Sequence, residues 1–234
     1  ETITAVKFGE TFSYAMTFDQ RDPFYVLDMT VGQAPAIKGS VKLDGFSTYL
    51  HPLNEDQTLL VAIGQNVSGT GNDLMPSGLL VTVFDAVDPQ NPRALASKTL
   101  ENDDFIDSSS HAAWEPKAVQ YANGTLVIPV SMYHYADRSD MWEDAENHTF
   151  NEEKNFEGFY VLDLTNAEED GIKEVFRVNH ISGSYSEPYC TGGLTQSRSI
   201  LYDDGSLMTM YDHLVVSSDI KTGVEQWKLN VTIE

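Results

Sequence analysis

The sequence predicts an all-β protein, a β-propeller built from four-stranded antiparallel blades. Three observations favour this fold class. Short runs of alternating apolar and polar residues follow one another along the chain, and no segment shows convincing helical periodicity. Polar and glycine-rich turns separate the runs at short intervals. The third observation is an aspartate that recurs at the end of one alternating run in each unit, at Asp28, Asp85, Asp163 and Asp219.

The recurring aspartate defines a repeat. Its spacings are 57, 78 and 56 residues, and removing about 22 residues from the acid-rich stretch in the long interval restores the common period. In two units a proline follows the aspartate by seven residues, Pro35 and Pro92, so the turn chemistry repeats as well. A β-sandwich also has many short strands, but it gives no reason for a strand-ending aspartate at a fixed period. We therefore expect a propeller.

Each repeat contains four expected strands, which is the content of one propeller blade. We expect a single propeller region over residues 1–234, with blades at 1–43, 46–100, 112–178 and 197–231 and a long acidic loop insertion at 131–157. The first blade has expected strands at 2–9, 11–18, 24–29 and 36–43. The second has them at 46–52, 59–64, 79–85 and 94–100. The third has them at 112–121, 125–130, 158–164 and 172–178. The fourth has them at 197–202, 206–211, 213–219 and 224–231.

Composition limits the partners. The chain has 36 acidic and 14 basic residues, a net charge of −22, so it repels nucleic-acid phosphates and anionic lipid. Its 41% hydrophobic content is too high for a disordered chain, and no apolar run is long enough to cross a membrane. We expect a folded protein that binds no nucleic acid and does not insert into a membrane. No secretory leader is visible at the start of this sequence.

Other residues indicate the compartment. The single cysteine, Cys190, excludes an internal disulfide and a cysteine-based zinc site, and is either a buried apolar residue or half of a bridge to another chain. N-glycosylation sequons exceed the roughly two expected by chance, and we expect all of them in loops, turns or strand ends. They lie at Asn66, Asn123, Asn147 and Asn230. We therefore expect a secreted or cell-surface protein that carries N-linked glycans.

The chain resembles a known family over nearly its whole length. The most specific phrase is Gly45–Pro52, and the runs Phe18–Asp28 and Asp219–Gly223 also match, as do the Asp-Pro-Gln-Asn-Pro phrase that begins at Asp88 and the Pro-Lys-Ala phrase that begins at Pro116. The sequence is similar to the secreted β-propeller-domain family of largely uncharacterised extracellular proteins. The resemblance implies an extracellular location, a propeller with more than four blades of which this chain is the C-terminal part, and no established reaction. Just before Pro116 the family tends to have an Asp-His-Lys-like phrase, and this chain departs from it.

The expected strand order places the long connections on one face of the propeller, which is where recognition usually resides. These connections are 65–78, 101–111, 131–157 and 179–196. Two of them are strongly acidic, and oxygen ligands at that density suit Ca²⁺. The calcium candidates are Asp103, Asp104, Asp107, Asp137, Asp140, Glu143 and Asp144. The stretch lacks the alternation and the turn glycine of an EF-hand, so a solvated acidic loop is the competing interpretation.

A second group of candidates is expected at the central channel. His51 lies in an innermost strand, His111 lies at the mouth of another, and Glu115 and Arg198 are expected to approach the same channel. A histidine, a carboxylate and a guanidinium around one cavity could support acid–base chemistry or hold an anion. The alternative is structural, because inner strands commonly use such side chains to satisfy one another. No serine-hydrolase triad, phosphate loop or zinc motif stands out.

Together these features favour an extracellular, glycosylated binding or assembly module. Its expected partners are other extracellular proteins, copies of itself or glycans, contacted through the acidic face of long loops. Two alternatives remain open. One is a secreted hydrolase or oxidoreductase that uses His51, His111, Glu115 and Arg198. The other is a calcium-dependent adhesion or surface-layer module.

Overall fold

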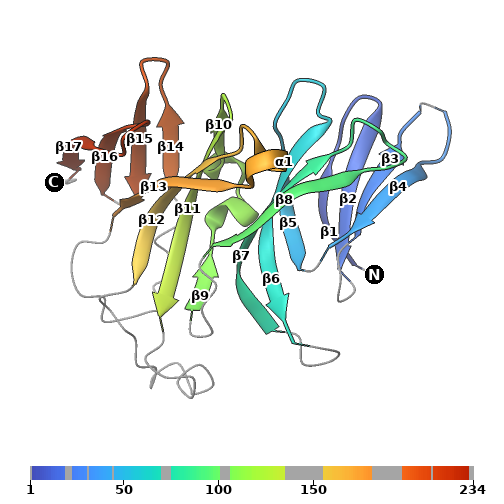
Figure 1. Cartoon of the computed structure of the whole chain (residues 1–234), viewed down its shortest axis with the longest axis horizontal. Helices are drawn as coiled ribbons and strands as arrows, with labels where there is room; N and C mark the ends of the chain where they lie inside the picture. The colour runs from blue at the N-terminus through green and yellow to red at the C-terminus, as the bar shows by residue number, and fades with distance from the viewer. Residues whose placement is uncertain are drawn as a thin grey trace. The chain divides into compact units, whose positions relative to one another are not determined.

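The computed structural model describes residues 2–18, 23–30, 32–43, 45–69, 75–100, 106–134, 155–180, 197–211 and 213–231. Their secondary structure is almost entirely antiparallel β-sheet, in four sheets (Figure 1). The chain divides into two compact units, which are described separately. Unit 1 comprises residues 1–100 and 166–172, and unit 2 comprises residues 101–165 and 173–234.

Unit 1 contains two four-stranded blades, each ordered as in the sequence. The first blade is formed by β1 (Thr2–Lys7), β2 (Phe12–Phe18), β3 (Pro23–Asp28) and β4 (Ala36–Lys42). The second is formed by β5 (Phe46–Pro52), β6 (Leu59–Ser68), β7 (Met75–Asp85) and β8 (Arg93–Leu100). The two blades share a core in which Tyr14, Phe24 and Phe84 stack in series, with ring centroids 5.6 and 4.3 Å apart. Burial of these large apolar side chains supplies the main drive for the two sheets to pack face to face.

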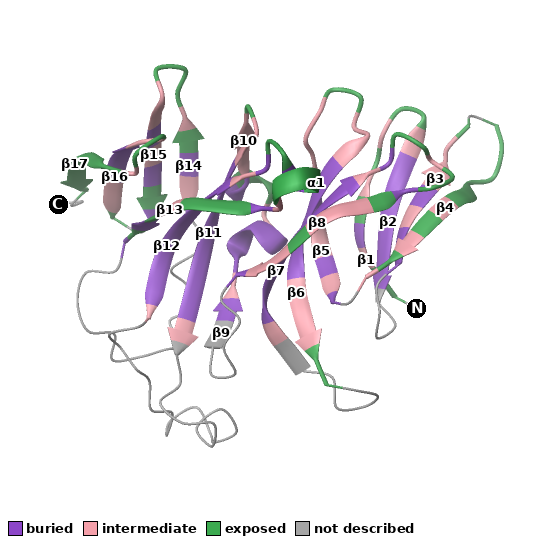
Figure 2. Ribbon diagram, in the orientation of Figure 1, coloured by how far each residue is buried: buried purple, intermediate pink, exposed green. Residues whose placement is uncertain are grey.

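Unit 2 also contains two blades. The third sheet is formed by β10 (Gln120–Ala122), β11 (Thr125–His134), β12 (Phe156–Asp163) and β13 (Lys173–Asn179), and β9 (Ile106–Ser109) also pairs with β11. The fourth is formed by β14 (Arg198–Leu201), β15 (Ser206–Tyr211), β16 (Leu214–Asp219) and β17 (Glu225–Asn230). A core that includes Phe159, Val161, Leu207 and Val216 joins them. Figure 2 shows β11 and β12 buried along most of their length and β17 exposed.

The recurring aspartate has the same structural role in all four blades. It ends the third strand, and its Oδ1 accepts the backbone N–H two residues later, from Thr30, Val87, Thr165 and Lys221, at 2.8–3.1 Å. The register of strands three and four also shifts, as at a β-bulge, between the residues two and one before each aspartate. The sequence repeat therefore encodes a repeated bulge and an Asx turn.

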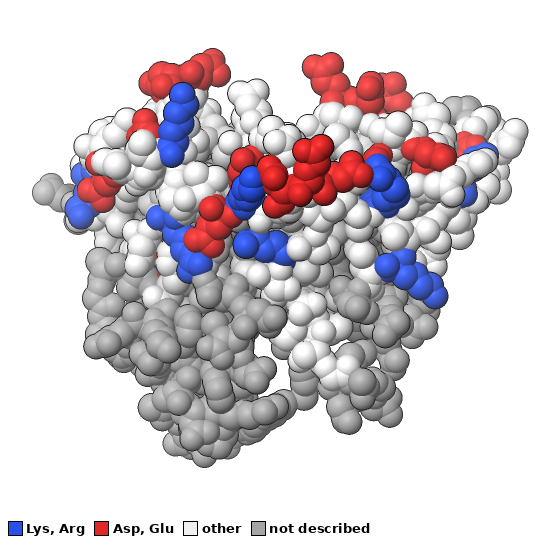
Figure 3. Space-filling view, in the orientation of Figure 1, with Lys and Arg blue, Asp and Glu red and all other residues white. Residues whose placement is uncertain are grey.

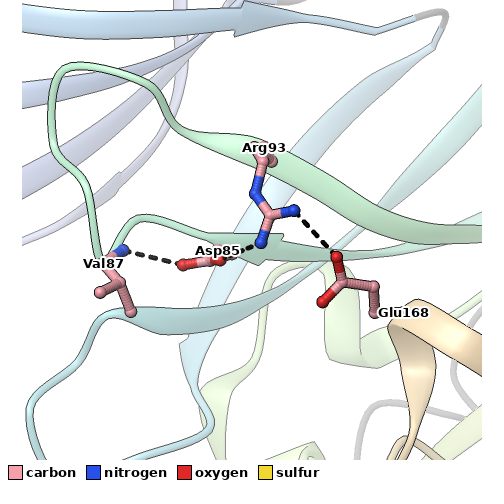
Figure 4. A network of polar contacts seen from close by, with 4 residues as sticks. All are labelled: Asp85, Val87, Arg93 and Glu168. Carbon is pink, nitrogen blue, oxygen red and sulfur yellow. Dashed lines mark hydrogen bonds and ion pairs between the residues drawn. The ribbon is translucent and has the colours of Figure 1, made fainter.

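A short helix lies beside the second blade in unit 1. This helix, α1 (Ala167–Asp170), presents Glu168 to Arg93 at the start of β8. Arg93 donates to Glu168 at 2.8 Å and to Asp85 at 2.6 Å, while Asp85 also accepts the Val87 N–H (Figure 4). Basic and acidic side chains accordingly lie side by side over β8 and α1 in Figure 3.

The observed strands correct two expectations. The expected first strand of the third blade, 112–121, is wrong, because two short 3₁₀ helices, η2 (His111–Ala113) and η3 (Pro116–Ala118), separate β9 from β10. Pro116 cannot donate to a ladder, and Ser110 and Glu115 cap the two turns with their side chains. The connection expected at 65–78 is much shorter, because β6 and β7 extend into it and pair as far as Ser68 and Met75. No helix in the described ranges is long and apolar enough to cross a membrane.

Candidate functional site

Three of the four expected channel residues lie together at the two 3₁₀ helices of unit 2. We call residues 110–118, which contain η2 and η3, the 3₁₀ segment. Ser110 fixes its start by donating to the Pro129 carbonyl on β11, and its oxygen accepts the Ala112 N–H at 3.1 Å. Ala112 and Ala118 are fully buried, so the segment is anchored on both sides. His111 is also buried, and its ring forms a T-shaped pair with that of Trp114, with centroids 5.7 Å apart. Trp114 itself is 64% exposed, which is unusual for the largest apolar side chain.

Glu115 and Arg198 form a loose ion pair beside this histidine. The Glu115 Oε1 accepts the Lys117 N–H at 3.0 Å, and its Oε2 lies 4.0 Å from Nη2 of Arg198. Arg198 also donates to the Ser197 carbonyl at 2.7 Å. A separation of 4.0 Å is an ion pair without a direct hydrogen bond, so the carboxylate and the guanidinium both keep unused hydrogen-bonding capacity toward solvent.

The pKa values of His111 and Glu115 are both lowered in this cluster. Burial lowers the pKa of His111, with Glu115 acting in the opposite direction and Arg198 adding to the lowering. The Lys117 N–H lowers the pKa of Glu115, with Arg198 contributing. At neutral pH the cluster therefore presents an uncharged histidine, a carboxylate and a guanidinium. Such a set can accept and donate hydrogen bonds, and the histidine can in principle take up a proton.

His51, the fourth expected channel residue, lies on β5 in unit 1. It is half-buried, and its Nδ1 is 3.1 Å from the Tyr49 hydroxyl. Burial lowers the pKa of His51, and the charge of Lys7 lowers it further.

The sequence analysis missed a second polar cluster in unit 2. Glu157, at the start of β12, is 3% exposed and accepts hydrogen bonds from two tyrosine hydroxyls, Tyr133 on β11 and Tyr211 on β15. Two charge-assisted hydrogen bonds offset part of the cost of burying the carboxylate. Glu157 stands within the apolar run of β12, and an isolated acid in a fully buried strand is the signal that could have identified it.

His180 extends the buried polar region. It follows β13, is 4% exposed, and its Nε2 lies 2.8 Å from the Thr209 hydroxyl on β15. The edges of the rings of Phe159 and Tyr211 pack against it. Burial lowers the pKa of His180 to about 4, so the ring is neutral at physiological pH. Within the described residues, His180 Nδ1 has no hydrogen-bond partner.

These buried groups lie where long connections meet the sheets of unit 2. The strand ends at Ile106, His134, Phe156, Asn179 and Arg198 adjoin the segments 101–105, 135–154 and 181–196. Strand registers place the four ends of the third blade together, since Ile106 pairs with His134, Met132 pairs with Phe156 and Gly158 pairs with Asn179. We call these five strand ends the loop edge. The hydrogen bond from the Tyr211 hydroxyl to Glu157 links β15 of the fourth blade to β12 at the loop edge.

The calcium candidates fall almost entirely in these segments. Asp103, Asp104, Asp137, Asp140, Glu143 and Asp144 lie outside the described residues, and Asp107 is described only through the backbone of β9. Elsewhere, in the parts of the chain that the structure describes, no group of three or more His, Cys, Asp or Glu side chains could hold a metal ion. Asn147 and Cys190 also lie outside the described residues.

The other sequons differ in accessibility. Asn123 is exposed at a tight turn with a φ of +49°, and Asn230 is exposed at the end of β17. Asn66 lies in β6 rather than in the expected loop, is half-buried, and donates from Nδ2 to the Ser77 hydroxyl at 2.9 Å. A glycan at Asn66 would have to share the nitrogen that makes this bond.

Two known proteins are similar in sequence to part of this chain. An uncharacterised protein of Archaeoglobus fulgidus is 34% identical over 93 residues, which are 40% of this chain and 13% of that protein. An uncharacterised protein of Methanocaldococcus jannaschii is 32% identical over 93 residues, with the same coverage. The matches thus span a small part of these curated relatives.

Solved structures show weak likeness. The computationally designed Ika4 protein has a TM-score of 0.38 at 14% identity and covers 99% of this chain and 92% of its own. Cobalt-substituted Synechocystis apocarotenoid oxygenase has a TM-score of 0.44 at 9% identity and covers 94% of this chain and 46% of its own. The family model described as the β-propeller domain matches residues 1–223, nearly the whole chain. Together with the four antiparallel sheets and their repeated Asx turns, this match shows that the chain belongs to the β-propeller domain family.

Proposed function

We propose that this β-propeller is an extracellular, glycosylated binding or assembly module that contacts other extracellular proteins, copies of itself or glycans through the loop edge of unit 2. The observation that carries the proposal is the meeting of three long connections at strand ends held by Glu157 and its two tyrosines. Recognition loops usually stand on such a rigid base.

The composition of the connections supports a contact surface of a particular kind. Segment 135–154 has seven acidic and two basic residues, and 101–105 has three acidic and no basic residues. A strongly acidic surface attracts basic partners and repels a second acidic surface unless cations are present. We therefore expect binding to a basic partner to weaken as salt rises, because salt screens exposed charges.

Glycosylation is the second part of the proposal. The exposed positions of Asn123 and Asn230 make both accessible to a glycosyl transfer enzyme, whereas the hydrogen bond of Asn66 competes. The location is tested by the intact mass of native protein before and after enzymatic deglycosylation. Mass lost from peptides containing Asn123 or Asn230 supports it, and the absence of sugar at every sequon would overturn the extracellular assignment.

The binding role is tested by replacing residues 137–153 with a short Gly-Ser linker. The matched control changes Asp203 to Asn, which lowers the acidic charge at a described turn outside the loop edge and creates no new sequon. Sedimentation velocity at rising protein concentration provides the readout. We expect the linker variant to lose association and the control to keep it. A native chain that does not associate, or a linker variant that associates as the native chain does, would overturn the proposed role.

A further inference from the structure

The 3₁₀ segment of unit 2 presents an exposed aromatic surface on a rigid base. Trp114 is 64% exposed although its backbone N–H donates to His111 and its ring rests against the buried imidazole. The residues on either side are fixed by the Ser110 anchor and the buried alanines of η2 and η3. An exposed indole that is already ordered loses little conformational entropy when a ligand covers it.

A donor and an acceptor lie near the histidine against which this indole packs. Glu115 and Arg198 are both about a third exposed, and their nearest charged atoms are 4.0 Å apart, too far for a direct hydrogen bond. The charges of both residues act on His111, which also packs against Trp114, so three side chains gather around this histidine. The carboxylate can accept from a hydroxyl group, and the guanidinium can donate to one.

We propose that Trp114, Glu115 and Arg198 form a binding site for a neutral hexopyranose, either a free sugar or the end residue of a glycan. The C–H face of a pyranose ring covers the indole, and adjacent hydroxyl groups donate to Glu115 and accept from Arg198. A hydroxyl is both donor and acceptor, so neighbouring hydroxyls suit a pair that offers one of each. His111 is a positioning residue, because it supports the indole.

The charge balance selects a neutral sugar over an acidic one. The Glu115 and Arg198 charges cancel, so the pair offers no net attraction for an anion, and the chain as a whole carries a charge of −22. The carboxylate of a uronic or sialic acid would be repelled by ionised Glu115 and gain only what Arg198 returns. This inference does not rest on the proposed function. Arg198 belongs to the loop edge, but the residues of the sugar site all lie outside 137–153, the segment replaced in that test.

The test is a titration with neutral monosaccharides (glucose, galactose, mannose and N-acetylglucosamine) followed by the indole N–H signals of labelled protein. Trp114 is one of three tryptophans, so its signal is assigned by its absence in Trp114→Phe. We expect at least one sugar to shift that signal with a dissociation constant in the millimolar range and to leave Trp227 unmoved. Comparison with a methyl glycoside and a trisaccharide separates a free-sugar site from a glycan-end site, and binding of either supports the proposal.

Variants then assign the contacts. Trp114→Ala should weaken binding by roughly tenfold or more, and Glu115→Gln and Arg198→Gln by several-fold. Trp227→Ala is the matched control, because Trp227 is 45% exposed on β17 of the same unit. If Trp114→Ala proves unfolded by its thermal melt, Glu115→Gln and Arg198→Gln carry the test.

Three results would overturn the inference. One is the absence of any shift with every neutral sugar at saturating concentration. Another is tighter binding of glucuronate than of glucose, which would indicate an anion site. The third is an equal loss in Trp114→Ala and Trp227→Ala. The Gly-Ser linker variant should retain sugar binding, so failure of the loop-edge role and failure of this site are distinguishable.

Discussion

The Tyr211 hydroxyl donates to the buried carboxylate of Glu157, 54 residues away in the sequence. Tyr211 is the last residue of β15 in the fourth blade, and Glu157 is the second residue of β12 in the third. The second carboxylate oxygen accepts from Tyr133, so one acidic side chain satisfies two tyrosines where two blades meet. Because buried polar groups are costly when unpaired, this arrangement makes Glu157 a specific point of attachment between the two sheets of unit 2.

Glu157→Ala should lower the free energy of unfolding by about 2 to 4 kcal/mol, because two tyrosine hydroxyls lose their acceptor. Glu157→Gln should cost less than half of that, since the amide offers one acceptor oxygen and one donor group. Tyr133→Phe and Tyr211→Phe should each cost about 1 kcal/mol. Urea unfolding measures all four. Equal midpoints for Glu157→Ala and the parent chain would show that the carboxylate is not a structural link.

His180 should make stability depend on pH between about 6.5 and about 4. Its folded pKa of about 4 lies below the ordinary value, so the unfolded chain takes up a proton at higher pH than the folded chain does. Stability from this group is therefore complete above pH 6.5 and is lost as the pH falls toward 4, by about 3 kcal/mol at most. Glu157 and Tyr211 lie beside His180, so the effect of His180 protonation must be separated from that of its neighbours.

The measurement compares urea unfolding of the parent chain and His180→Gln from pH 7 to pH 4. Glutamine keeps hydrogen-bonding capacity toward Thr209 and does not titrate. We expect the difference between the two proteins to shrink or reverse as the pH falls, while the background from carboxylates cancels. A difference that stays constant over this range would contradict the assignment.

Gly223→Ala should destabilise the fourth blade by about 1 to 3 kcal/mol, from backbone strain and overpacking. Gly223 has a φ of +70°, and an added Cβ would lie 2.6 Å from the Phe176 ring. Gly171 is the control within the chain, because its φ is +72° but no described residue has an atom within 4 Å of an added Cβ. Thermal melts of the two alanine variants separate packing from strain. Equal losses would show that the Phe176 contact contributes nothing.

The four-stranded blades could be predicted from the sequence because their signals are local. Alternation and turn residues lie within a few positions of each strand, and the expected ranges 46–52 and 206–211 match β5 and β15. The aspartate repeat also proved local, since each carboxylate binds a backbone N–H two residues away. The local signals around Pro116 were present too, and alternation was wrongly weighted above the caps and the proline.

The site could be predicted only in part because its contacts are distant in sequence. Nothing near Glu157 indicates that Tyr211 will reach it, and the placement of Arg198 by Glu115 depends on the packing of two blades. The exposed state of Trp114 is equally a tertiary property, because a tryptophan in an alternating run is usually taken as core. Pattern identifies which residues carry chemistry, whereas the fold decides which of them meet.

The Asp85 network allows a turn cap to be separated from ion pairs at one position. Asp85 accepts the Val87 N–H with Oδ1 and the Arg93 guanidinium with Oδ2, and Arg93 also reaches Glu168 (Figure 4). Arg93 and Glu168 are exposed, so Arg93→Ala should lower the free energy of unfolding only slightly, and the loss should shrink further in high salt. Asp85→Asn keeps an oxygen that accepts the Val87 N–H but loses the ion pair with Arg93, so its effect should match that of Arg93→Ala.

Asp85→Ala loses both the ion pair and the turn cap, and should lower the free energy of unfolding by about 1 to 2 kcal/mol. The loss beyond that of Asp85→Asn should not depend on salt, because it arises from the uncapped turn. Urea unfolding at low and high salt measures the three variants. If the extra loss in Asp85→Ala over Asp85→Asn shrinks in high salt, the recurring aspartate acts through its charge rather than through its turn.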